Sequence, residues 1–222
     1  MTHTTPDLAV DARSLARRFG ARWVLRGASL EVRRGEAVGL VGANGSGKST
    51  LLRLLCTLLR PSAGTASVFG ADLIRDADQV RANVGFFSPV PGVYDDLTAR
   101  ENARFAATML GRTAAEADAA VDRAGLAAAA DQRARGFSSG MLRRLALARL
   151  FLQSPDLLLL DEPYNNFDAA GIGLVNETIQ ATLSRGGAAL VVVHDTASAA
   201  PVVTRWLALE DGRVTPRAGA PR

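Results

Sequence analysis

Short apolar runs separated by turn residues dominate both ends of the chain. Residues 8–41 alternate such runs with turn signals and end on AVGLV (37–41), which is apolar throughout and is followed by glycine. Similar runs, LLLLD (157–161) and AALVVV (188–193), flank a helical pattern near 169–185. Uninterrupted apolar runs of this length are typical of strands buried on both faces, and the strand–helix–strand order predicts a parallel sheet.

Two capping signals predict where helices of the middle region begin. Thr98 with Glu101, and Thr113 with Glu116, match the T-x-x-E capping box, in which the hydroxyl and the carboxylate each accept from a free backbone N–H. A helix is therefore expected to begin after each threonine. The alanine-rich segment 113–130 is expected to be helical.

Leucine spacing predicts two further helices. STLLRLLCTLL (49–59) repeats leucine at helical intervals and is stopped at Pro61. SGMLRRLALARLFLQ (139–153) carries an apolar stripe and is stopped at Pro155. Residues 61–92 read as strands and turns.

Together these patterns predict one α/β domain. Residues 8–89 and 154–214 form its core, residues 90–153 an inserted helical subdomain, and residues 215–222 a disordered tail. The length of 222 residues suits a single substantial domain.

Composition narrows the function classes. Aromatic residues make up only 5% of the chain against 48% for all hydrophobic residues, so we expect a core of alanine, leucine and valine. The net charge is +4, but the arginines are scattered, so we expect no nucleic-acid partner. Cys56 is the single cysteine, and His3 and His194 are the only histidines, which excludes an internal disulfide and a Cys/His metal cluster.

The apolar pattern also bears on location. The opening MTHTTPDLAV lacks the basic and apolar segments of a secretion signal, and the longest apolar runs are far too short to span a bilayer. We therefore expect a cytoplasmic protein.

A glycine-rich loop between a predicted strand and a predicted helix is the strongest chemical signal. GANGSGKST satisfies the phosphate-loop pattern G-x-x-x-x-G-K-[ST] with the residues Gly42, Ala43, Asn44, Gly45, Ser46, Gly47, Lys48, Ser49 and Thr50. Its backbone N–H groups and the following helix dipole can bind phosphate oxygens. The loop predicts a nucleoside triphosphate, with Mg²⁺ on the Ser49 hydroxyl, without choosing among kinases, GTPases and ATPases.

Lys48 is the only lysine in a chain whose 26 basic residues are otherwise all arginine. A compact ammonium can enter the loop between the β- and γ-phosphates, whereas the planar guanidinium is too wide and prefers bidentate pairing outside. We therefore interpret Lys48 as a position where the small size of the ammonium group requires lysine in place of arginine.

Polar residues follow two of the predicted buried strands. Asp161 lies at the carboxyl end of LLLLD, where it can bind Mg²⁺, usually through water, and Glu162 follows directly, placed to orient and deprotonate an attacking water. His194 comes just after AALVVV and can hydrogen-bond a γ-phosphate. Glu162, His194 and Lys48 are the candidate catalytic residues.

Taken together, these motifs resemble the ATP-binding subunit of an ABC transporter over residues 8–214. FSSGM (137–141) is similar to the family signature, and YNNFD (164–168) to the loop that ends in the family's aspartate, here Asp168. The resemblance implies an α/β P-loop NTPase (RecA-like) fold. It further implies a mostly parallel sheet, an inserted α-helical subdomain and N-terminal antiparallel strands.

The resemblance also implies roles outside the phosphate loop. RRFGARWVLRGASLEV looks like the family's opening strands and places Phe19 where an aromatic ring stacks on adenine. Ser138 and Gly140 are the signature positions expected to touch the γ-phosphate held by the opposite subunit. Asp168 completes the expected ATP-binding set, and His194 matches the family's switch histidine.

Several positions depart from the family pattern. Phe137, Ser139 and Met141 replace Leu, Gly and Gln of LSGGQ, and the loop 164–168 carries an unusual pair of asparagines. Pro89 stands where the family usually has glutamine, and proline offers no side-chain oxygen to a metal or water. Water, a backbone carbonyl or the neighbouring serine must then serve the metal there.

The resemblance implies partners and a cargo class. In this family two ATPase subunits dimerise head to tail around two ATP molecules, so we expect a second ATPase subunit, in a homodimer, and separate transmembrane permease subunits. The chain would then lie peripherally on the inner face of the cell membrane. The segment VGFFSPVPGVYDDLTARENARF and the GM of the signature look most like the haem exporter ATPases of cytochrome c biogenesis.

Other functions stay open at this point. One alternative is the ATPase of a general exporter of drugs or lipids, and another is a soluble ABC-type ATPase without a transport role. A kinase is formally possible. A GTPase is excluded because its N-K-x-D guanine reader needs a second lysine.

Overall fold

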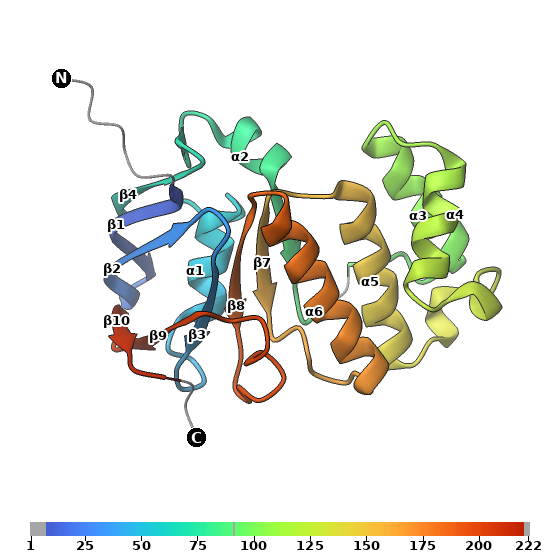
Figure 1. Cartoon of the computed structure of the whole chain (residues 1–222). Helices are drawn as coiled ribbons and strands as arrows, with labels where there is room; N and C mark the ends of the chain where they lie inside the picture. Colours follow the sequence, from blue (N-terminus) through green and yellow to red (C-terminus); the bar gives the residue numbers. More distant parts are fainter. Residues whose placement is uncertain (1–7, 91, 220–222) are drawn as a thin grey trace.

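Two β-sheets and a group of helices make up residues 8–90 and 92–219, which the computed structural model describes (Figure 1). The larger sheet has the strand order β10-β9-β3-β8-β7-β6 and is parallel except at the β9–β10 hairpin. Its strands are β3 (Ala37–Val41), β6 (Val84–Phe87), β7 (Leu157–Asp161), β8 (Ala188–Val192), β9 (Arg205–Glu210) and β10 (Arg213–Arg217). The predicted parallel sheet is confirmed.

The smaller sheet is antiparallel throughout and has the order β2-β1-β4-β5. Its strands are β1 (Leu8–Phe19), β2 (Arg22–Arg33), β4 (Ala63–Val68) and β5 (Ala71–Asp72). The long hairpin β1–β2 turns at Gly20, whose φ of 56° lies in the left-handed region that glycine adopts without strain. These are the antiparallel N-terminal strands that the sequence predicts.

Six α-helices are formed by the described residues: α1 (Lys48–Leu55), α2 (Ala77–Asn83), α3 (Ala99–Met109), α4 (Ala114–Arg123), α5 (Ser139–Gln153) and α6 (Ala169–Ser184). Both predicted capping boxes form, with Thr98 accepting from the Glu101 N–H and Thr113 from the Glu116 N–H. Helix α5 has the predicted bounds. No helix in the described ranges is sufficiently long and apolar to cross a bilayer.

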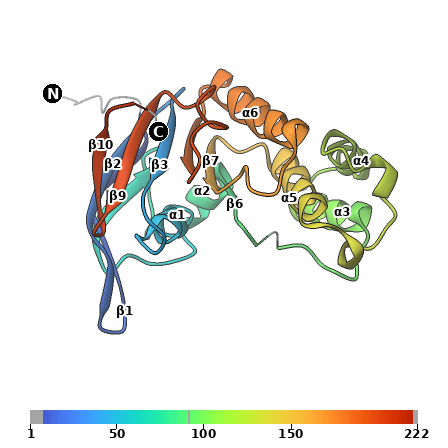
Figure 2. The same cartoon turned by 90° about the horizontal axis from the view of Figure 1, so that it is seen from below.

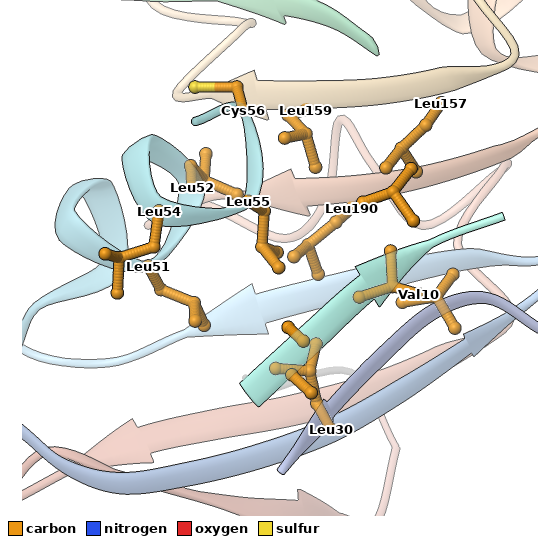
Figure 3. Packing of buried hydrophobic residues seen from close by; sticks show 14 of the residues in the cluster. Val10, Leu30, Leu51, Leu52, Leu54, Leu55, Cys56, Leu157, Leu159 and Leu190 are labelled. Carbon is orange, nitrogen blue, oxygen red and sulfur yellow. The ribbon is translucent and has the colours of Figure 1, made fainter. Parts of the chain in front are cut away.

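Helix α1 is buried between the two sheets. Figure 3 shows its leucines, among them Leu52 and Leu55, next to Leu159 and Leu190 of the larger sheet and near Leu30 of the smaller one. All but the last are fully buried, and each such side chain contributes roughly 1.5–3 kcal/mol. This packing fixes where α1 begins, and therefore where the loop before it lies.

The opposite face of the larger sheet is covered by α5 and α6. Leu158 and Leu160 of β7 point to this face, opposite to Leu157 and Leu159, because successive strand residues alternate. Ile179 of α6 packs there. The leucine run is therefore buried on both sides, as its unbroken pattern indicates.

Helices α3, α4 and α5 form a helical lobe, which lies at the far end of the molecule from β1 and β2 in both Figure 1 and Figure 2. Its own hydrophobic cluster is rich in alanine and contains Ala99, Ala103, Ala107, Ala117, Ala120, Val121, Leu145 and Ala148. Helix α5 also contributes Leu147 and Leu150 to the cluster beneath the sheet. The lobe is thereby attached to the sheet through α5.

Some expectations about helices are wrong. Residues 77–83, within a segment expected to hold only strands and turns, form α2; a single buried side chain, Val80, leaves no visible stripe in so short a helix. Helix α4 ends at Arg123, and Gly125 with a φ of 74° leads out of it, so 113–130 is not helical throughout. Helix α1 ends at Leu55, four residues early.

The disordered tail is also corrected. Residues 215–217 belong to β10, which pairs with β9 from Arg213 opposite Glu210 to Arg217 opposite Trp206. Backbone pairing with β9 holds this polar strand, although most of its side chains are exposed. Residues 220–222 lie outside the described residues.

Candidate functional site

The glycine-rich loop connects the end of β3 to the start of α1. Gly47 precedes the helix with a φ of 110°, and a Cβ there would lie 2.9 Å from a methyl group of Leu25 on β2. At Gly42 a Cβ would lie 2.4 Å from the carbonyl oxygen of Leu209 on β9. Both positions therefore require glycine, because neighbouring strands press the loop into its tight course.

Lys48 is buried inside this loop. The residue is only 6% exposed, and Nζ donates to the carbonyl oxygens of Gly42 at 2.7 Å and Ala43 at 3.0 Å. Burial lowers the pKa of the ammonium, and the carboxylates of Glu162 and Asp161 act in the opposite direction. The single lysine is thus enclosed by the backbone of the loop, as the size argument requires.

Buried polar atoms near the loop lack partners, which tests whether the site fits a phosphate and its metal. Ser46 Oγ and Asp161 Oδ2 are buried without a hydrogen bond to any described residue. Burial raises the pKa of the Asp161 carboxyl, while a hydrogen bond with the Ser49 hydroxyl lowers it. An acidic oxygen beside a hydroxyl, both near an ammonium, fits a Mg²⁺-bound polyphosphate, because hard cations take oxygen ligands.

Glu162 has a backbone that is fixed on both sides. Its φ of 50° lies in the left-handed region, which costs a non-glycine residue about 1–3 kcal/mol. Its N–H donates to Val192 O at 2.9 Å, at the end of β8, and its carbonyl accepts from Arg143 Nη2 at 2.5 Å. This conformation turns the side chain out of the strand direction toward the next loop.

The Glu162 carboxylate contacts two different loops. Oε1 lies 2.9 Å from Nε2 of His194, and Oε2 accepts from Nδ2 of Asn165 at 2.5 Å. Strands β7 and β8 are parallel neighbours, so the residues after their carboxyl ends meet at one edge of the sheet. The predicted trio of Asp161, Glu162 and His194 is therefore brought together by the sheet order.

The signature segment begins α5. Ser138 is its N-cap and accepts from the Met141 N–H at 3.3 Å. A Cβ at Gly140 would lie 3.1 Å from the carbonyl oxygen of Asn166, so the start of α5 borders the loop 164–168. Among the described residues no hydrogen bond joins Ser138 or Gly140 to the glycine-rich loop of the same chain.

Asp168 links two helices. Its Oδ1 accepts from the Gly171 N–H at 2.8 Å, which caps α6, and from Arg144 Nη2 of α5 at 2.8 Å. The hydrogen bond from Gly171 and the nearby Arg144 guanidinium hold the pKa of this carboxyl below its ordinary value. The aspartate is therefore a cap and an ion-pair partner within its own chain.

Phe19 lies at the turn of the β1–β2 hairpin and is 44% exposed. Its ring faces the guanidinium of Arg17 at 4.6 Å from the centroid. Farther along β2, Val24 and Leu25 lie against Gly47, so this hairpin flanks the glycine-rich loop.

Pro89 stands where the family usually has glutamine. The hydroxyl of the neighbouring Ser88 accepts a hydrogen bond from the Val90 N–H at 3.2 Å.

Sequence reasoning missed Arg143 and did not assign Asn165 a contact. Arg143 is 4% exposed and stacks over Phe87 at 4.8 Å as well as donating to Glu162 O. The sequence pattern does not distinguish this buried arginine, because exposed positions of the same helix also carry arginine. The unusual asparagine pair was visible, but only the fold shows which of the two reaches Glu162.

Comparison with known proteins decides the family. A family model described as ABC transporter matches residues 25–165, more than half of the chain.

This chain belongs to the ABC transporter family.

Curated relatives are similar to this ABC transporter family member over nearly its whole length. A cytochrome c biogenesis ATP-binding export protein, CcmA, of Xanthomonas campestris pv. campestris is 42% identical over 209 residues, which cover 94% of this chain and 96% of that protein. A Nod factor export ATP-binding protein I of Burkholderia lata is 36% identical over 94% of this chain and 70% of that protein. The chain is thus an ATP-binding, ATP-hydrolysing subunit of the ABC transporter family.

Solved structures confirm the fold. An ATP-binding subunit of an ABC transporter superposes with a TM-score of 0.84 at 28% identity, covering 93% of this chain and 88% of that one. A dimeric ATP-binding cassette in a post-hydrolysis state with ADP and phosphate superposes with a TM-score of 0.81 at 24% identity, covering 95% and 100%. The predicted P-loop NTPase architecture is confirmed by both.

Proposed function

We propose that this ATPase subunit drives the export step of cytochrome c biogenesis, with haem as the cargo. The observation that carries the proposal is the 42% identity to the cytochrome c biogenesis export protein across almost the full length of both chains. The Nod factor export relatives are less similar and extend beyond this chain, which covers 70% of their length. Because the sequence identity extends over nearly the full length of both proteins, it favours a shared transport role and not only a shared ATPase activity.

The glycine-rich loop is the proposed ATP phosphate site. The N–H groups of residues 42–50 and the start of α1 bind the phosphates, and the Lys48 ammonium exchanges its contacts with Gly42 O and Ala43 O for phosphate oxygens. Ser49 and Asp161 hold Mg²⁺, the latter through water. When bound, Mg²⁺ neutralises phosphate charge during transfer.

Glu162 is the proposed general base. Its carboxylate follows Asp161 on the strand end and reaches the loop that carries His194. From this position it can accept a proton from the attacking water, while His194 exchanges its contact with Glu162 Oε1 for a hydrogen bond donated to the γ-phosphate. A cavity of about 220 Å³ lined by Glu162, Asn165 and His194 has room for that water.

A second copy of the chain completes the proposed site. Ser138 and Gly140 at the N-terminus of α5, with Asp168 nearby, face ATP held by the partner's loop. The free N–H groups of a helix start favour an anion. The absence of a bond between Ser138 and the glycine-rich loop within the described part of one chain supports this arrangement. Phe19 would stack on the adenine ring from the hairpin beside the loop.

A hydrophobic groove is the proposed docking surface for the membrane permease. A cavity of about 530 Å³ lies between β6 and α3, and its lining includes Val90, Tyr94, Phe105 and Met109, which are 47–75% exposed. Large apolar side chains gathered on a surface mark an interaction site. The groove joins the sheet to the helical lobe, so a permease segment seated there would contact both and hold the ATPase at the inner face of the membrane.

The cargo is tested in the source organism by deleting the gene and measuring covalently bound haem in c-type cytochromes. We expect haem staining to disappear, to return with the wild-type gene, and to stay absent with an equally expressed Glu162→Gln variant. Normal c-type cytochromes in the deletion strain would refute the cargo. A general exporter of drugs or lipids would then be the better assignment.

A further inference from the structure

Asn165 holds one oxygen of the Glu162 carboxylate, while His194 holds the other. Nδ2 of Asn165 donates to Oε2 at 2.5 Å, and Oε1 lies 2.9 Å from His194 Nε2. An ionised carboxylate has about four lone-pair sites, so these two contacts leave room for a water on each oxygen. The carboxylate is oriented from two sides and is still able to accept a proton.

The local backbone explains how Asn165 reaches back to Glu162. The chain turns after Glu162, with the Asn165 N–H 3.4 Å from the Glu162 carbonyl oxygen, and Pro163 restricts φ within the turn. Tyr164 is buried and its hydroxyl donates to Asn176 Oδ1 at 2.7 Å. Asn176 in turn donates to Ser198 O at 3.1 Å, so the turn is anchored to the segment after His194.

The backbone itself does not require an asparagine at position 165. Asn166, not Asn165, has the left-handed φ of 59° that asparagine tolerates better than most residues. The Asn165 side chain is exposed, and in the part of the chain that is described its one hydrogen bond goes to Glu162. The backbone conformation thus accounts for an asparagine at position 166 but not for the one at position 165.

We propose that Asn165 is a positioning residue for hydrolysis, which rests on the proposed role of Glu162 as general base. A glutamate side chain loses rotamer freedom when it is fixed, and a displacement of about 1 Å in a catalytic group can cost roughly a hundredfold in rate. By holding Oε2, Asn165 keeps the carboxylate directed into the cavity beside His194. Its contribution falls on the chemical step, because it does not touch the phosphate loop.

The test uses the purified full-length chain and compares Asn165→Ala and Asn165→Asp with wild type. Alanine removes the donor, and we expect kcat for ATP hydrolysis to fall about tenfold with KM and ATP affinity within about twofold. Aspartate keeps the shape but repels the carboxylate, so we expect a larger loss, roughly thirtyfold. Thermal unfolding is measured first, and this exposed position should leave it nearly unchanged.

A neighbouring asparagine provides the matched control. Asn166→Gly removes an equivalent amide while keeping the left-handed backbone, and we expect kcat within about twofold of wild type. A second control places Asn165→Ala in the Glu162→Gln background. Because Asn165 acts through Glu162, the residual rate should fall less than twofold further, whereas a structural role would lower it by the full factor.

The outcomes separate this inference from the function on which it rests. Wild-type rates in both Asn165 variants, with an inactive Glu162→Gln, would remove Asn165 from catalysis and leave the base assignment intact. A full additional loss in the double variant would make Asn165 structural and overturn the proposal. Normal hydrolysis by Glu162→Gln would instead refute the general base itself. If the aspartate variant fails to fold, the alanine variant decides.

Discussion

The sheet core and the helical lobe are stabilised differently, and the core alone encloses the charged groups of the phosphate loop. The core packs leucine and valine on both faces of the larger sheet and buries Lys48 and Asp161 at its edge. The lobe packs mainly alanine and, apart from the buried Arg143 of α5, carries its charges near the surface, where Arg100 and Arg104 share Asp118. The difference separates a leucine- and valine-packed core that holds the phosphate loop from an alanine-packed helical lobe.

This contrast teaches where each region obtains its stability. A buried leucine contributes several times more than a buried alanine, because stabilisation scales with apolar area. The lobe therefore depends more on helix caps, and both T-x-x-E boxes lie there. Exposed ion pairs add little, with a median of about 0–1 kcal/mol.

The largest effect should come from the chemistry of the core. We expect Glu162→Gln to bind ATP with wild-type affinity but to lose about 10²–10⁴-fold in kcat, because the amide cannot accept a proton. Titration calorimetry with ATP and a phosphate-release assay measure the two quantities. A variant that hydrolyses ATP at an unchanged rate would place the base elsewhere.

Leucine-to-alanine substitutions compare the two hydrophobic regions directly. Leu159 in the sheet and Leu145 in the lobe are both fully buried, so each change should cost about 2–5 kcal/mol in the free energy of unfolding. We expect Leu159→Ala to cost more, because it lies among large side chains between α1 and the sheet. Denaturant unfolding measures both. A larger cost at Leu145 would show that the alanine-rich lobe is the more tightly packed region.

Lys48→Arg tests the enclosed ammonium. The loop carbonyls at 2.7 and 3.0 Å leave no space for a planar guanidinium, so we expect ATP affinity to fall by about ten- to a hundredfold, roughly 1.4–2.7 kcal/mol. Titration calorimetry with ATP gives the value, and Arg53→Lys on the same helix is the matched control for the charge type. Equal affinity in Lys48→Arg would contradict the steric argument.

Removing a helix cap should have a smaller effect and should act on the lobe. Thr113→Ala deletes the acceptor for the Glu116 N–H, at a cost of about 1 kcal/mol. Hydrogen exchange should rise in α4 and stay unchanged in the larger sheet. Thr113→Ser, which retains the hydroxyl, is the control. Equal acceleration in both regions would show that they unfold as one unit.

The smallest effect concerns acid. Hydrogen bonds from Arg104 and Arg100 lower the pKa of Asp118, and a hydrogen bond from Arg100 lowers that of Asp131. Because the pKa values of these two carboxyls are lowered in the folded protein, the ionised side chains stabilise the lobe at pH values above about 4, the ordinary pKa of an aspartate. This stabilisation is lost as the pH falls through the lowered pKa values of the folded state. Burial raises the pKa of Asp161, so protonation there favours the folded core. Exchange corrected for its intrinsic rate should therefore rise first in the lobe, below about pH 4.

Much of the fold could be predicted because local signals were strong. The β3, β7 and β8 runs were unbroken, and α5 followed from its apolar stripe and from the stop at Pro155. Helix α2 and strand β10 were not predicted. The first has one buried side chain and the second is mostly exposed, so their stability comes from neighbours that the local pattern does not contain.

The phosphate loop, Asp161, Glu162 and His194 were determined as candidates by the sequence itself, because each motif lies within a few residues or at the end of an apolar strand. Tertiary structure alone decided that Asn165 and His194 share the Glu162 carboxylate and that Arg143 supports its backbone. Those contacts join a residue of α5 with residues of the loops that follow β7 and β8. The contacts of His194 and Arg143 depend on which strands become neighbours and how a helix packs on them, and long-range packing sets both, whereas the Asn165 contact also needs the local turn after Glu162.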